Sequence, residues 1–216
     1  MNALIILFYR IVTFFTRVPA KTRALQTELR AEKLSGFNLR DTSYINYQSN
    51  LSDIPYGKGN LGLNGCGPIA LFNALMALEQ NTHNKNGLDG FAQIVDHLER
   101  KGAALKGKFG TAPQAINSYL KALGYKTGTI LSKKATKVNL FSDNYDIFIS
   151  LICNNSKSIR GGLHFIFTEK NGSLNKEDLS SFTSHNPEMT GSSLYETLNM
   201  CSNNEIRHVY TIGIKK

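Results

Sequence analysis

A cysteine flanked by two glycines stands at the start of an apolar segment, in the stretch GCGPIAL. These residues are Gly65, Cys66 and Gly67, followed by Pro68. A helix N-terminus favours the thiolate, because free backbone N–H groups and the positive end of the helix dipole lower the pKa of a thiol. Pro68 suits a first helical turn. We therefore predict a helix at about 67–78 with a nucleophilic thiolate at Cys66, which the two glycines leave open to a substrate carbonyl. The alternative is a small buried residue at a helix start.

A nucleophilic cysteine needs a base, and His164 has the best setting among the five histidines. It follows Gly161 and Gly162 and opens the stretch LHFIFT, where it alternates with apolar residues. The glycines leave room for a substrate, and a strand holds the ring more firmly than a loop would. We predict His164 as the base. The others are expected in a polar loop, an amphipathic helix, a strand-end turn and the last strand: His83, His97, His185 and His208.

An imidazole in this role needs a third group that holds its tautomer, commonly Asn or Asp. Asn186, in the stretch SHNP, follows His164 by 22 residues, 186 minus 164, a workable separation for a hairpin. The asparagine–proline pair would end a strand near the histidine. Taken alone, Asn186 would be an ordinary turn residue.

The elements that would position these side chains change type along the chain. Helices are predicted at 88–100 and 112–123, after the cysteine helix. Beyond Tyr125 the pattern becomes short alternating or apolar runs separated by turn residues, which indicates strands. The runs are YKTGTIL, YDIFISLIC, LHFIFTE, LSSFTSHN and RHVYTIGIK. Helices followed by strands indicate an α+β fold, with a helical lobe packed against an antiparallel sheet.

The order Cys, His, Asn, with the cysteine on a first helix and the others on a later sheet, resembles the papain-like cysteine peptidases. The closer resemblance is to a bacterial subgroup, the bacteriocin-processing or double-glycine leader peptidases. The matching stretches are GCGPIAL, GTAPQAINSYLKALGY, YDIFISLI followed by GGLHFIFT, and SHNP, which cover about residues 45–190. The resemblance implies a papain-like fold and a Cys66–His164–Asn186 triad.

In that family a glutamine upstream of the cysteine donates an N–H group to the oxyanion. Six residues before Cys66 this chain has Asn60, and the nearest upstream glutamine is Gln48. We expect Gln48 to complete the oxyanion hole, with Asn60 and Asn64 as substitutes. The backbone N–H groups at the helix start would also contribute.

The function implied by the resemblance is hydrolysis of peptide bonds through a thioester acyl-enzyme, with a peptide or protein as substrate. The same fold can also carry out amide transfer or deamidation. A third alternative is a non-catalytic module that binds a peptide or attaches to a membrane. No metal or organic cofactor is implied. A nucleic-acid partner is not expected, because it would rest on net charge alone.

The composition fits a globular protein with a core: 41% of the residues are hydrophobic and 19% are charged. The three cysteines are far apart and odd in number, which predicts neither a disulfide framework nor a zinc site. The net charge of +9 suggests attraction to anionic surfaces.

The N-terminal segment divides the chain into residues 1–40, an apolar and basic helical part with a connector, and residues 41–216, the peptidase domain. The apolar run from Ala3 to Tyr9 is too short to span a bilayer. As a helix, residues 1–18 would carry a narrow polar stripe that includes Arg10 and Arg17, which suits an anionic membrane surface. A terminal helix packed on the domain is the alternative. A cytoplasmic or peripherally membrane-associated location is expected, with secretion left open.

Overall fold

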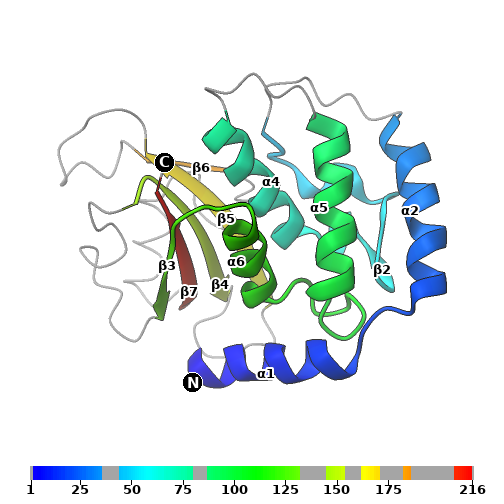
Figure 1. Cartoon of the computed structure of the whole chain (residues 1–216), viewed down its shortest axis with the longest axis horizontal. Coiled ribbons are helices and arrows are strands. Elements are labelled where there is room, and N and C mark those ends of the chain that lie inside the picture. Colours follow the sequence, from blue (N-terminus) through cyan, green and yellow to red (C-terminus); the bar gives the residue numbers. More distant parts are fainter. Residues whose placement is uncertain are drawn as a thin grey trace.

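The α+β class is confirmed in the computed structural model, which describes residues 2–35, 44–79, 87–131, 145–153, 162–170, 182–185 and 207–215. Helices occupy the N-terminal part of the chain and one side of the molecule, and the larger sheet occupies the other side (Figure 1). The domain boundary predicted near residue 40 falls in 36–43, outside the described residues.

The helices are α1 (Asn2–Phe15), α2 (Ala20–Ser35), the 3₁₀ turn η1 (Gln48–Leu51), α3 (Leu61–Asn64), α4 (Cys66–Glu79), α5 (Gly87–Lys101) and α6 (Pro113–Ala122). The helices predicted at 67–78, 88–100 and 112–123 are present within one residue of those bounds, the helix expected over residues 1–18 ends at Phe15, and η1 and α3 were not predicted. The cysteine helix α4 is apolar on nearly every side, which suits a helix enclosed by other elements. It packs against β4 (Ile147–Cys153), β5 (Leu163–Lys170) and α5.

The larger sheet has the strand order β3–β7–β4–β5–β6, with every pair antiparallel. Its other strands are β3 (Thr127–Leu131), β6 (Phe182–His185) and β7 (Arg207–Ile214). All seven residues of the central strand β4 are buried, so both faces of the sheet are covered there. Within this register Ile152 of β4 lies opposite His164 of β5.

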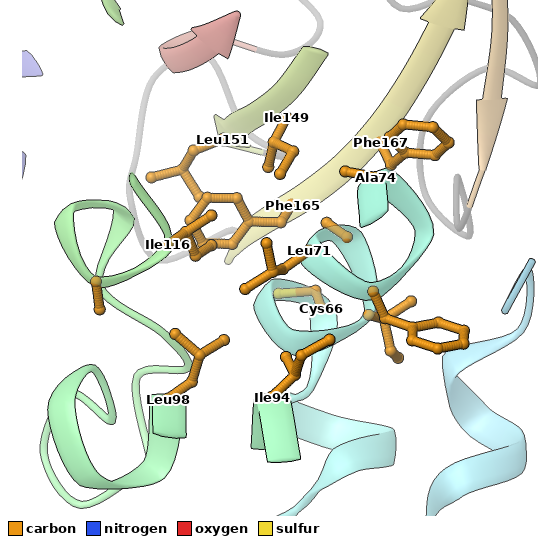
Figure 2. Close-up of a cluster of buried hydrophobic side chains, with 14 of the residues drawn as sticks. Cys66, Leu71, Ala74, Ile94, Leu98, Ile116, Ile149, Leu151, Phe165 and Phe167 are labelled. Carbon is orange, nitrogen blue, oxygen red and sulfur yellow. The ribbon is translucent and has the colours of Figure 1, made fainter. Parts of the chain in front are cut away.

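The core lies between α4 and the sheet, as Figure 2 shows. Alternate residues of β5 supply it: Phe165 and Phe167 belong to the main buried cluster, whereas His164 does not. The predicted alternation of this strand is therefore confirmed. The helix α5 contributes an i, i+3, i+4, i+7 stripe, namely Phe91, Ile94, Val95 and Leu98.

The described segment before the cysteine helix, residues 44–65, contains several short elements. Strands β1 (Pro55–Tyr56) and β2 (Gly59–Asn60) form a small hairpin between η1 and α3. Gly57 in its turn has a φ of 63°, a conformation that favours glycine. The hairpin thus fixes the chain just before α4.

Candidate active site

Cys66 is the first residue of α4, directly after the short helix α3 and its C-cap Gly65. Its side chain is buried, and it belongs to the main hydrophobic cluster together with Leu71 of α4 and Phe165 of β5 (Figure 2). The predicted position at a helix start is therefore confirmed. A buried location alone would suit a structural cysteine, so its polar contacts decide its chemistry.

The contacts of Cys66 lower the pKa of its thiol below the ordinary value of 9.0. Burial acts in the opposite direction and is the largest single effect, because a thiolate is poorly solvated there. The hydrogen bond and the electrostatic interaction with His164 outweigh it, helped by hydrogen bonds from the backbone N–H groups of Phe165 and Gly67. The thiolate is thus stabilised by specific partners.

His164 is the second residue of β5, and its side chain is hydrogen-bonded to Cys66. Only 8% of the residue is exposed, so the pair is largely shielded from water. The preceding Gly162 has a φ of 88°, which lets the chain turn into the strand just before the histidine. The structure therefore brings together Cys66 and His164, which are 98 residues apart in the sequence (164 minus 66).

Asn186, the predicted third member, lies outside the described residues, as does Gly161. The strand that leads to Asn186 is described: β6 pairs with β5, and its last residue His185 lies opposite Phe167. Phe167 is three residues from His164 along β5. The role of Asn186 therefore stays a prediction, with its preceding strand next to the histidine strand.

The three candidates for the oxyanion hole have separate structural roles. Gln48 is buried in η1, and its Nε2 donates to the Gly62 carbonyl at 3.0 Å. Asn60 is the N-cap of α3, where its Oδ1 accepts from the Leu63 N–H at 2.9 Å. Asn64 ends α3 and places its Nδ2 against Gly59. Gln48 thus lies beside the segment that leads into Cys66, since η1 packs on α3.

The two glycines next to Cys66 have packing roles. A Cβ on Gly65 would lie 2.4 Å from the Leu61 carbonyl oxygen, and one on Gly67 would lie 2.5 Å from the Thr111 Cβ. Both distances are shorter than any ordinary contact, so each glycine allows a close approach within the protein. That they also leave Cys66 open to a substrate carbonyl stays a prediction.

A buried Tyr56–Thr111 pair beside the site was not found from the sequence. The Tyr56 hydroxyl and the Thr111 Oγ1 are 2.7 Å apart, and Thr111 is the residue that packs on Gly67. Burial raises the pKa of the Tyr56 hydroxyl, and electrostatic interaction with Glu99 and then with Cys66 raises it further. The only sequence signal was the GTAP stretch that contains Thr111. The pair supports the first turn of α4.

Tyr9 of α1 was also not singled out, although it lies near the thiol. Its pKa is raised by burial, and then by electrostatic interaction with Cys66 and Cys153. Its hydroxyl donates to the Phe109 carbonyl at 3.1 Å. The N-terminal helix therefore reaches the neighbourhood of the candidate nucleophile.

The described ranges contain no cluster of three or more His, Cys, Asp or Glu side chains that could hold a metal ion. The side chains that meet at the site are the Cys66 thiol and the His164 imidazole. Comparisons with protein-family models, curated proteins and solved structures found no match to this chain.

Proposed function

We propose that this protein is a papain-like cysteine peptidase, with Cys66 as nucleophile and His164 as general base. The observation that carries the proposal is the hydrogen bond between a helix-start cysteine and a buried histidine on the neighbouring strand, together with the lowered thiol pKa. A structural cysteine in a hydrophobic cluster needs no such partner. An activated nucleophile does.

The mechanism follows from the groups at the site. His164 takes the thiol proton, and the Cys66 sulfur attacks the carbonyl carbon of a peptide bond. The negative charge develops on the carbonyl oxygen, where the backbone at the start of α4 and the Gln48 amide are proposed to stabilise it. His164 then protonates the leaving amine, and a thioester with Cys66 remains. Water, deprotonated by His164, releases the acyl group. Asn186 is proposed to hold the imidazole in place.

The test is cleavage of a mixed peptide library, read by mass spectrometry of the products. We expect cleavage by the wild type and by Cys153→Ala, and none by Cys66→Ala or His164→Ala. Cys153 is the matched control, since it is also a buried free cysteine but lies at the end of β4. Equal cleavage by wild type and Cys66→Ala would exclude the proposal.

Amide transfer on the same thioester would appear in the same assay. Addition of hydroxylamine would then give a hydroxamate in place of the carboxylic acid product, because the amine competes with water for the acyl group. A transferase would form the hydroxamate even at a low concentration of hydroxylamine. In the absence of hydroxylamine it would form little of the carboxylic acid.

A non-catalytic peptide-binding module is the second candidate, and one observation favours it. The Gln48 Nε2, which is the donor proposed for the oxyanion, hydrogen-bonds the Gly62 carbonyl within the protein. If the protein is such a module, immobilised Cys66→Ala would bind peptides as well as the immobilised wild type does. Neither protein would form a cleavage product.

A further inference from the structure

The N-terminal helix α1 is attached to the protein by one face only. Ile5 and Tyr9 on this inner face are buried, with 8% and 2% of each residue exposed. Two hydrogen bonds fix the helix in place: Tyr9 donates to the Phe109 carbonyl at 3.1 Å, and Gln114 Nε2 donates to the Ile6 carbonyl at 2.8 Å. α1 is thus docked through its inner face.

The outer face of α1 is strongly apolar. The stripe consists of Leu4, Leu7, Ile11, Phe14 and Phe15, which are 67%, 49%, 50%, 65% and 76% exposed. Spacings of three and four residues place the first four on one side of a helix. Exposed apolar residues elsewhere among the described ones are scattered over several elements, which is ordinary for a protein surface. With Phe8, which is 43% exposed, α1 carries six exposed large apolar side chains, which is not ordinary for one short helix.

Positive charge borders this stripe. Arg10 lies on one flank of the stripe, Arg17 lies two residues beyond the end of α1, and both are exposed. The Arg17 guanidinium lies 5.6 Å from the Phe14 ring centroid. Residues 1–27 contain four basic residues, the other two being Lys21 and Arg23, and no Asp or Glu. The surface around the stripe therefore complements an anionic one.

The geometry favours a helix that lies on a bilayer. α1 runs along an edge of the molecule (Figure 1). No single helix in the described part of the chain is long and apolar enough to cross a membrane; α1 and α2 pass that test only as a pair, and the pair is bent by 100°. A second copy of this chain is disfavoured as the partner that covers the stripe. Pairing two copies through this face would bring Arg10 and Arg17 of both copies together.

We propose that α1 docks the protein onto an anionic lipid bilayer. The helix lies in the membrane plane, the apolar stripe enters the boundary between head groups and acyl chains, and Arg10 and Arg17 contact lipid phosphates. This proposal goes beyond the peptidase activity and does not depend on it.

The test uses the full chain and vesicles of phosphatidylcholine with or without phosphatidylglycerol. The chain has no tryptophan, so Phe14→Trp introduces a single reporter in the stripe. We expect its emission to shift to shorter wavelength with anionic vesicles, and the protein to float with them. Leu7→Gln/Phe14→Gln should weaken flotation at least about tenfold. Arg10→Gln/Arg17→Gln should weaken it about fivefold or more, through loss of charge.

The matched control is Leu25→Gln/Leu123→Gln, which removes two residues that are 60% and 51% exposed and lie outside α1. It should bind vesicles like the wild type. Circular dichroism confirms that each variant remains folded. The proposal is overturned if the wild type floats with neither vesicle, if the control is weakened as much as the α1 variant, or if lipid charge makes no difference. It is also overturned if ultracentrifugation shows a dimer that depends on Leu7 and Phe14 and the protein does not bind vesicles.

Discussion

At the scale of single residues, the charge state of Cys66 depends on His164. Their hydrogen bond and electrostatic interaction keep the thiol pKa below 9.0 against the effect of burial. When the pH is lowered below 9.0, Cys66 of the wild type should therefore still be present as a reactive thiolate. In His164→Ala only burial and the backbone contacts remain, so the thiol pKa should rise. We expect iodoacetamide to modify Cys66 at least about tenfold more slowly in this variant near pH 7.

Cys153 provides the control in the same experiment, because mass spectrometry reports each cysteine separately. It is fully buried in β4, so its modification would show that the protein has opened. A Cys66 rate that is the same with and without His164 would mean that the imidazole does not activate the thiol.

His208 predicts a pH dependence of stability. Burial lowers its pKa from 6.5 to about 4, and its Nε2 lies 2.6 Å from the Thr211 Oγ1. Between these two pH values the unfolded chain binds a proton that the folded protein does not. The stabilisation is therefore present above pH 6.5 and is lost as the pH falls toward about 4. The loss amounts to roughly 3 kcal/mol.

Urea unfolding of the wild type and His208→Gln measures this effect. The wild type should lose more free energy of unfolding than the variant across this pH window, since glutamine does not titrate. Identical pH profiles would show that His208 is protonated in the folded protein as readily as in the unfolded chain.

At the scale of elements, one buried arginine joins α2, α5 and the hairpin before the active site. Arg30 is 1% exposed; it hydrogen-bonds the Pro55 carbonyl at 3.0 Å, both Glu99 oxygens at 3.1 and 2.9 Å, and Asp96. Glu99 also accepts from the Gly57 N–H at 2.7 Å. The network fixes the chain that leads to Cys66.

Arg30→Met should therefore lower the free energy of unfolding by about 3–5 kcal/mol, because the Glu99 carboxylate stays buried without its cation. Asp96→Asn should cost about 1 kcal/mol or less, since the Asp96 side chain is 37% exposed. In the Arg30→Met background, Glu99→Gln should recover part of the loss. Urea unfolding measures all of these variants, and equal losses for Arg30→Met and Asp96→Asn would contradict the role of the buried pair.

The sequence was sufficient to predict the larger elements but not the small ones. The helices α4, α5 and α6 and the five strands of the sheet were predicted near their observed positions, because each has its own apolar periodicity. The hairpin β1–β2 has none. Its position depends on distant partners, such as the Lys106 carbonyl that accepts from the Lys58 N–H. No local pattern reports such contacts.

The candidate site shows the same limit. Cys66 and His164 were predicted because each sits at the start of a regular element, with glycines beside it. The Tyr56–Thr111 pair joins residues 55 positions apart, one in the two-residue strand β1 and one before α6, so no local pattern indicated their contact. Asn186 stays a prediction from the resemblance and from the strand before it.

At the scale of the whole molecule, α1 is part of the core as well as of the surface. Ile5 and Tyr9 of α1, with Val18 just after it, belong to the same hydrophobic cluster as Cys66 and Phe165. The N-terminal segment is therefore packed on the rest of the protein, although its outer face is free for another partner. Loss of the inner contacts should weaken the fold as a whole.

Two neighbouring residues test this directly. Ile5 is 8% exposed and Leu4 is 67% exposed, and replacement by alanine removes side chains of the same volume from the same helix. Ile5→Ala should lower the free energy of unfolding by about 2–5 kcal/mol, because it leaves a cavity in the core. Leu4→Ala should change it by about 0.5 kcal/mol or less. The two values come from urea unfolding in the absence of lipid. If both substitutions were equally mild, α1 would be only loosely held in solution, and its inner face would add little to the stability of the protein that carries Cys66.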